Sequence, residues 1–203
     1  EYAQRYPVVQ CCEYVPELKQ PTVSIDNYTA AAETIDYLIN QGHRRIALLS
    51  ADNDFISTQQ RRQGYEDVLR KAGLPCGGEL VALADADYSY ASGLVAAERL
   101  LRTEPRPTAV CCVSDILALS VISLAHDMGL RVPEDLSVTG FDDVDYTTMF
   151  HPHLTTVAQP CYEMGQESLR ILLRMLRGGQ PPRTRTFLPY KLVLRESVAA
   201  HNE

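Results

Sequence analysis

The sequence predicts an α/β protein built on doubly wound parallel sheets. Short apolar, β-rich runs alternate along the chain with longer runs of helical period, which is the pattern of parallel strands joined by crossover helices. The strand runs are apolar almost throughout, as expected where helices cover both faces of a sheet. A length of 203 residues with 45% hydrophobic composition supports a sizeable core, in one large domain or two small ones.

The first two thirds of the chain follow a regular order of strands and helices. Strands are expected at 7–12 and 22–25, before a helix at 28–41 that ends because Gly42 favours helix termination. Three strand-then-helix units and a closing strand come next. The expected units are 45–50 with 58–72, 79–83 with 89–101, and 109–113 with 115–128, followed by the strand 136–140.

The last third of the chain is predicted to cross back to the part of the fold that the first 40 residues form. Residues 154–160 are expected to form a connecting strand, followed by an amphipathic helix at 162–177. The Gly-, Pro- and Arg-rich stretch 177–186 is predicted as an exposed loop, and a final strand is expected at 191–195. The first 40 residues have no opening strand-helix partners of their own. The order therefore predicts two lobes joined by several crossings, the first lobe being incomplete.

Composition excludes some functions for these residues. The chain has 19 Lys and Arg against 26 Asp and Glu, and this net charge of −7 disfavours a nucleic-acid-binding surface. No apolar run reaches the roughly 18 residues that a membrane span requires. Residues 1–6 lack the charged and apolar regions of a signal peptide, so we expect a cytoplasmic protein with no membrane partner.

The six cysteines are predicted to be reduced residues that fill the core. They include two adjacent pairs, Cys11-Cys12 and Cys111-Cys112, and no C-x-x-C spacing. Neighbouring side chains in a strand point to opposite faces, so neither pair is expected to bind a metal together.

Polar side chains gather where the predicted strands end. In doubly wound sheets, ligands bind in the crevice beyond these carboxyl ends. Carboxylates there can accept hydrogen bonds from hydroxyls or ring N–H groups, Arg61 can donate charge-assisted hydrogen bonds, and Tyr88 or Phe55 can stack on a ring. This set suits a sugar or a nucleoside. Ser57 and Asp115 could instead serve only as helix caps. Asp142 and Asp143 repel each other, so at least one should have a partner.

No motif for catalysis or cofactor binding is found. The chain lacks the nucleophile elbow, the phosphate-binding glycine loops and the zinc-binding H-E-x-x-H sequence. His151 and His153 lie close together, but a metal site would need further ligands, so we expect no metal there. His43 follows a helix end, where a structural role is favoured. The sequence predicts a protein that is not an enzyme and has no cofactor.

A series of motifs closely resembles the effector-binding core of LacI/GalR-type bacterial transcriptional repressors. The match runs in order from Pro21 to Val198. Stretches near the first helix and the return crossing are most similar to the cytidine-responsive branch of the family. The motifs in their order are GHRRIA (42–47), RRQGY (61–65), PTAV (107–110), SD (114–115), VPEDLS (132–137), GFD (140–142) and LTTVAQP (154–160).

The resemblance implies a periplasmic-binding-protein-like fold of two α/β lobes, with a ligand in the cleft between them and a homodimer. The implied division is 1–43 for the rest of the N-terminal lobe, 44–158 for the C-terminal lobe, 159–185 for the return into the N-terminal lobe, and 186–203 for the final strand and tail. These repressors bind operator DNA through an N-terminal helix-turn-helix. The 203 residues hold no such module, so DNA binding is expected only in a longer parent protein.

The resemblance also implies ligand-binding residues. Arg61 matches the arginine that grips ligand hydroxyls or polar ring atoms, and Tyr88 falls where an aromatic ring stacks. Phe55 stands where the purine-responsive branch has an arginine, which argues against recognition of a purine oxo group. The full set carried over is Ser57, Arg61, Tyr88, Asp115, Asp142, Gln159, Asp26 and Phe55.

The leading hypothesis is therefore the effector-binding and dimerisation core of a DNA-binding repressor that senses a nucleoside such as cytidine. The alternative is a transport-type sugar- or nucleoside-binding protein, which has the same two lobes. A nucleoside-processing enzyme is a third class, for which the acidic cluster is the sole motive. For the leading hypothesis, Arg61→Ala should weaken effector binding and leave the fold intact.

Overall fold

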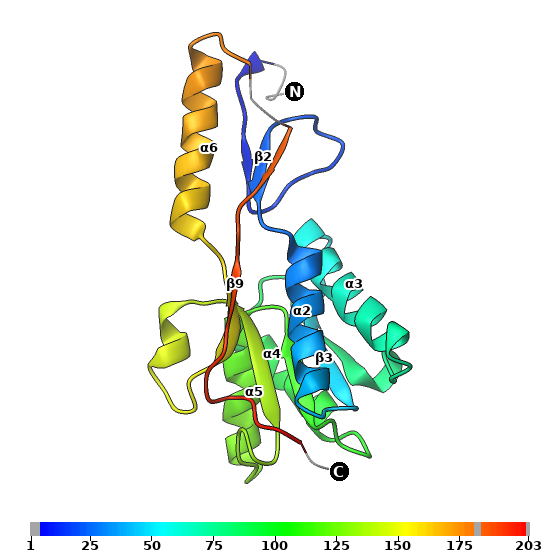
Figure 1. Cartoon of the computed structure of the whole chain (residues 1–203). Helices are drawn as coiled ribbons and strands as arrows, with labels where there is room; N and C mark the ends of the chain where they lie inside the picture. The colour runs from blue at the N-terminus through cyan, green and yellow to red at the C-terminus, as the bar shows by residue number, and fades with distance from the viewer. Residues whose placement is uncertain (1–4, 181–183, 202–203) are drawn as a thin grey trace.

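The chain folds around two sheets of unequal size (Figure 1). The computed structural model describes residues 5–180 and 184–201. The large sheet has six strands in the order β4-β3-β5-β6-β7-β9, and the small sheet has three in the order β1-β2-β8. The strands of the two sheets are β1 (Gln10–Cys11), β2 (Thr22–Ser24), β3 (Ile46–Ala51), β4 (Val81–Ala84), β5 (Ala109–Cys112), β6 (Ser137–Asp142), β7 (Thr155–Ala158), β8 (Arg185–Phe187) and β9 (Lys191–Val193).

Five α-helices in the described part of the chain connect or cover these strands. They are α2 (Asn27–Asn40), α3 (Ile56–Lys71), α4 (Tyr90–Leu101), α5 (Asp115–Asp127) and α6 (Cys161–Leu176), with short 3-10 turns at Gly78–Leu80 and Asp145–Thr148. None of these helices combines the length and apolar composition of a membrane span. We call the large sheet with α2 to α5 the large lobe, and the small sheet with α6 the small lobe.

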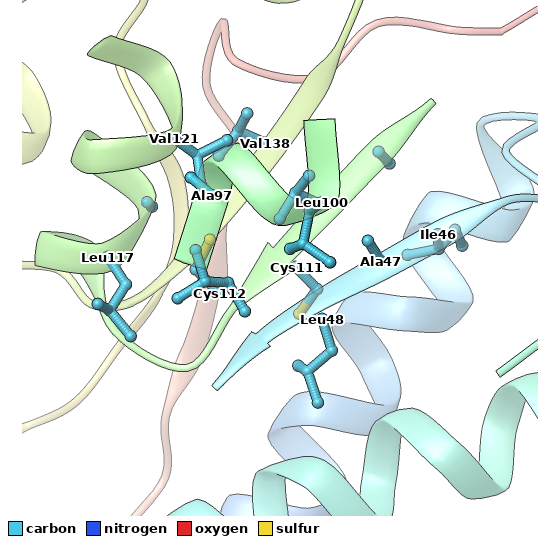
Figure 2. Packing of buried hydrophobic residues seen from close by; sticks show 14 of the residues in the cluster. Ile46, Ala47, Leu48, Ala97, Leu100, Cys111, Cys112, Leu117, Val121 and Val138 are labelled. Atoms are coloured by element: carbon cyan, nitrogen blue, oxygen red, sulfur yellow. The ribbon is translucent and has the colours of Figure 1, made fainter. Parts of the chain in front are cut away.

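The large lobe has the predicted doubly wound arrangement. Strands β3 to β7 pair in parallel, and β9 joins β7 as an antiparallel edge strand. Figure 2 shows side chains of β3 and β5 between helices on opposite sides. Ile46, Leu48 and Leu100 are almost completely buried, which explains why these strands are apolar on both faces. The predicted strands and helices are confirmed, with ends that shift by a few residues.

The small lobe has a thinner core. Val23 of β2 packs with Met164 and Ile171, which are the fully buried side chains on α6 among the described residues. Figure 1 shows α6 standing alone beside the small sheet. Its other apolar side chains, including Leu169 and Leu176, are exposed.

The chain crosses between the two lobes three times, after β2, after β7 and after β8. Helix α2 lies against α3, and its residues Ile35 and Leu38 belong to the core of the large lobe. This packing corrects the predicted boundary between 43 and 44, which assigned the helix to the first lobe. The hydrophobic pattern of α2 could not show which sheet the helix covers.

Two local predictions were wrong. The stretch predicted as an exposed loop contains β8, which pairs in parallel with β2; residues 181–183 of that loop lie outside the described residues. The six cysteines are free, but Cys11, Cys12 and Cys161 are exposed. The predicted packing role therefore holds for three of the six: Cys111 and Cys112 are buried in the core, and Cys76 packs against it. The sulfurs of Cys11 and Cys12 lie 3.9 Å apart, because Cys12 follows the strand end with a φ of 65° and the strand alternation stops there.

Gly64 permits the close contact between α2 and α3. A Cβ atom at this position would lie 2.6 Å from the carbonyl oxygen of Tyr28 and 3.1 Å from the backbone nitrogen of Ala32. We expect Gly64→Ala to lower the free energy of unfolding by about 1–3 kcal/mol, measured by urea denaturation, because the helices must separate. Gly165→Ala on α6 is the matched control. No atom lies within 4 Å of its Cβ position, so this variant should match or exceed wild-type stability, and equal losses in both variants would contradict the argument.

Candidate functional site

A pocket of about 340 Å³ lies at the edge of the large sheet where its parallel strands end. The strands β3, β4, β5 and β6 end at this edge, which is where ligands bind in doubly wound sheets. Segments of the small lobe and of the crossings complete the wall. The lining residues are Cys12, Glu13, Asn27, Phe55, Ser57, Arg61, Asp87, Tyr88, Ser114, Ile116, Asp142 and Gln159.

Arg61 is the central cation of this pocket. It lies on the second turn of α3 and is 8% exposed. Its Nε donates to Oδ1 of Asn27 at 2.9 Å, its Nη1 donates to the carbonyl oxygen of Val113 at 2.6 Å, and its guanidinium lies 3.5 Å from the centre of the Phe141 ring. Burial lowers the pKa of Arg61, and the nearby Asp142 carboxylate opposes this shift. These contacts hold the guanidinium plane in place and leave other N–H groups for a ligand.

Asp142 faces Arg61 across the pocket. One carboxylate oxygen lies 3.6 Å from Nη1 of Arg61 and accepts a hydrogen bond of 2.7 Å from Nε2 of Gln159. Burial raises the pKa of Asp142, while Arg61 and Gln159 act in the opposite direction. The neighbouring Asp143 pairs with Arg195 at 2.7 Å. The expectation that one of the adjacent carboxylates has a partner is therefore confirmed for both.

Aromatic rings form one wall of the pocket. Phe55 and Tyr88 stack with their centres 6.4 Å apart and their planes 25° from parallel. The Tyr88 hydroxyl contacts the Thr58 hydroxyl, which ties the ring to α3, and Phe55 is 47% exposed. A flat ligand ring can stack on this wall with one face, because apolar ring surface is available on the pocket side.

Glu13 brings a second carboxylate into the pocket from the small lobe. Its Oε2 accepts a hydrogen bond of 3.3 Å from the Ser57 backbone nitrogen, and its Oε1 contacts the Ser57 hydroxyl. Gln60 also donates to the hydroxyl of Tyr14 at 3.1 Å. Residues 13 and 14 therefore connect the small lobe to the first turns of α3.

The eight predicted ligand residues divide into two groups. Asp26 lies outside the pocket, where it caps α2 by accepting from Thr29. Asp115 is buried behind the lining, where it accepts from the Thr156 hydroxyl at 2.5 Å and from the Val144 backbone nitrogen at 2.9 Å. The six predicted residues that the structure brings together on the lining are Ser57, Arg61, Tyr88, Asp142, Gln159 and Phe55.

The capping alternative does not account for Ser57 or Asp115. The N-cap of α3 is Phe55, which makes no side-chain capping bond, and the N-cap of α5 is Ser114, whose hydroxyl accepts from the Leu117 backbone nitrogen. Both residues lie one or two positions inside their helices, so the sequence could not assign the cap.

Six lining residues lie outside the predicted ligand set: Cys12, Glu13, Asn27, Asp87, Ser114 and Ile116. Cys12 and Glu13 stand at the end of the first predicted strand, and the same strand-end rule that selected the other residues could have found them. Asn27 follows the predicted ligand Asp26 by one position and points to Arg61 instead of capping the helix. No sequence signal distinguishes these two neighbours.

A larger hollow of about 780 Å³ lies elsewhere on the large lobe. It is lined mainly by apolar side chains of α5 and of the segments around Val132 and Phe150. None of the strand-end carboxylates belongs to its lining. The smaller pocket is therefore the candidate ligand site, because it combines fixed charges, hydroxyls and aromatic rings.

Comparison with known proteins is consistent with this arrangement. The family model of the periplasmic binding protein-like domain matches residues 35–198. The chain is 40% identical over 194 residues to the HTH-type transcriptional repressor CytR of Escherichia coli (strain K12), and 35% identical over 193 residues to catabolite control protein A of Priestia megaterium. These matches cover 96% and 95% of this chain but 56% and 58% of the relatives. The chain thus spans about half the length of the curated relatives that it matches.

Solved structures of transcriptional regulators are also similar to this chain. A putative LacI transcriptional regulator from Bacillus cereus subsp. cytotoxis superposes with a TM-score of 0.91 at 30% identity, over 99% of this chain and 71% of that one. The transcriptional regulator CelR in complex with cellobiose gives a TM-score of 0.83 at 35% identity, over 93% and 57% of the two chains.

Proposed function

The chain belongs to the LacI/GalR family of transcriptional regulators as a periplasmic-binding-protein-like effector core, and from this membership we propose that it senses a nucleoside, cytidine first among them. The proposed binding site is the pocket around Arg61. In this proposal the chain does not catalyse a reaction and requires no cofactor.

One observation supports this proposal most strongly. A buried guanidinium, a facing carboxylate and a pair of stacked rings line a single pocket at the ends of the parallel strands. Arg61 would donate to the ligand, Asp142 and Glu13 would accept from ribose hydroxyls, and the Tyr88 and Phe55 rings would stack on the base. The pocket volume lies near the lower end of the roughly 300–1,000 Å³ typical of small-ligand sites, which suits a nucleoside.

The proposed mechanism is a shift between two arrangements of the lobes. Glu13 approaches the pocket from the small lobe, whereas Arg61 belongs to the large lobe. A ligand that contacts both would favour the closed arrangement, and it can change DNA affinity only through its different affinities for the two states. We propose that the parent protein binds operator DNA through a separate module and acts as a homodimer, as its similarity to HTH-type repressors supports.

Calorimetric titration of the protein with cytidine, adenosine, ribose and hypoxanthine tests the nucleoside. Cytidine should give a saturable heat with one site per chain, while hypoxanthine should give none, because Phe55 offers no donor to a purine oxo group. Absence of heat from every nucleoside would reject the nucleoside proposal. Cellobiose serves as the comparison ligand, and binding of it alone would identify a sugar-sensing core.

A further inference from the structure

Two histidines and a glutamate meet on the surface of the large lobe, away from the residues that line the Arg61 pocket. His151 and His153 precede β7, and Glu196 follows β9. Nδ1 of His151 lies 2.8 Å from Oε2 of Glu196, and Nδ1 of His153 lies 3.7 Å from Oε1. One ligand atom from each residue lies within 4.8 Å of the other two, so the glutamate supplies the third ligand that the sequence did not reveal.

The backbone around the three side chains is held firmly. The carbonyl oxygen of His153 accepts hydrogen bonds of 3.1 Å from the backbone nitrogens of both Glu196 and Ser197. The Ser197 hydroxyl donates to the carbonyl oxygen of Val138 at 2.6 Å and accepts from the backbone nitrogen of Thr155 at 2.8 Å. The two segments are thus fixed to each other and to the large sheet, which limits the entropy lost when all three side chains bind one ion.

The donor set has a clear chemical preference. Two imidazole nitrogens and one carboxylate oxygen suit Zn²⁺ and similar divalent transition metals better than Ca²⁺ or Mg²⁺, which prefer oxygen ligands. Ligands of one zinc ion lie about 3.4 Å apart, since each bond is about 2.1 Å long. The distances from Glu196 to the two histidines bracket this value. His151 is 74% exposed on its side chain, so its ring can reorient without disturbing the core.

Glu196 contacts both histidines and not one alone. Its Oε2 lies 2.8 Å from Nδ1 of His151 and also accepts from the backbone nitrogen of His153 at 3.1 Å. The second imidazole is stacked on the first with centres 4.3 Å apart, so both rings lie beside one carboxylate. Two rings and a carboxylate within ligand distance form the open three-ligand set in which water completes the coordination of zinc.

We propose that His151, His153 and Glu196 form a surface site for a divalent transition metal of the zinc type. The site shares no residue with the Arg61 pocket, so it stands independently of the proposed effector.

Titration of the 203-residue chain with Co²⁺, followed by displacement with Zn²⁺, tests the site. The visible absorption of bound Co²⁺ should saturate at one equivalent. His151→Gln, His153→Gln and Glu196→Gln should each weaken metal binding at least tenfold, because each removes or weakens one of three ligands. Circular dichroism of the metal-free variants should match the wild type, since the side chains lie on the surface.

Two controls separate this site from other ligands. His126→Gln alters an exposed histidine with one neighbouring carboxylate, Asp127, and should bind Co²⁺ as the wild type does. A thiolate-to-cobalt absorption band in the near ultraviolet would instead assign the metal to the exposed cysteines near Cys11. The proposal fails if that band accompanies binding or if no Co²⁺ binds. It also fails if the variant that combines His151→Gln, His153→Gln and Glu196→Gln binds Co²⁺ as well as the wild type does.

Discussion

Arg61→Ala is expected to weaken effector binding about 100-fold or more, which corresponds to about 2.7 kcal/mol. The guanidinium is buried in the pocket, and a hydrogen bond from a buried charged donor contributes more than a neutral one. Arg61→Lys keeps the charge but loses the planar fork that contacts Asn27 and Val113, so it should also bind weakly. Calorimetry with the proposed effector, cytidine, measures both variants.

The same substitution is also expected to destabilise the fold. Asn27 and the Val113 carbonyl oxygen would lose the donor that Arg61 provides, and Asp142 would keep only Gln159. Removing one member of a buried charged set typically costs about 3–5 kcal/mol. From the sequence alone we expected the fold to stay intact; the internal contacts of Arg61, which the sequence does not show, lead us to expect a loss of stability instead. Urea denaturation measures the loss.

Arg62→Ala is the matched control on the same helix. Arg62 is exposed and pairs with Glu66 one turn away, so its loss should change stability by less than about 0.5 kcal/mol and leave effector affinity unchanged. Unchanged affinity in Arg61→Ala, measured where the variant is still folded, would remove Arg61 from the proposed site.

Asp115→Asn is expected to stabilise the protein above neutral pH. Burial raises the pKa of Asp115 from 3.8 to about 7, against the hydrogen bonds from Thr156 and Val144. The folded state therefore keeps this proton up to about pH 7, whereas the unfolded chain releases it near pH 4, and stability falls as the pH rises between these values. At pH 8 the asparagine variant should be more stable by up to about 4 kcal/mol, because it carries no charge to bury.

The comparison must be made between variant and wild type at each pH. Burial lowers the pKa of His43 to about 4. Because of this residue, the free energy of unfolding rises with pH over part of the same range. That rise masks the fall in stability that Asp115 causes. Both proteins contain His43, and the difference between them isolates Asp115. Near pH 4 the two should be almost equally stable, since an asparagine can accept from Val144 and donate to the Thr156 hydroxyl. A constant difference from pH 4 to pH 8 would contradict the raised pKa, and exposed Asp127→Asn should show no such trend.

The fold could be predicted from the sequence because its signals are local. Strands such as β3 and β5 are covered on both faces, so their apolar runs identify them without knowledge of their neighbours. Strand β8 gives no such signal, since Arg185 and Phe187 are exposed and its place is set by pairing with β2. The side of α2 that packs on α3 is likewise decided by tertiary contacts.

Part of the pocket could also be predicted, because the end of each strand is visible in the local sequence pattern. The strand-end rule locates residues such as Arg61 and Asp142 near one edge, but it does not say which way a side chain turns. Asp115 turns inward to Thr156, and Asp26 turns to its own helix. Glu13 enters the pocket because the small lobe lies over the start of α3, and that juxtaposition follows from the crossings of the chain.

The three crossings between the lobes form a row. Ser24 at the end of β2 is in register with Phe187 of β8, and Ala158 at the end of β7 is in register with Lys191 of β9. A body attached by one flexible connection can turn about every axis, whereas a row of three resists torsion and bends mainly about the line that passes through it. In the proposed mechanism, opening and closing of the Arg61 pocket would thus be limited to one rotation, in which all three connections bend together.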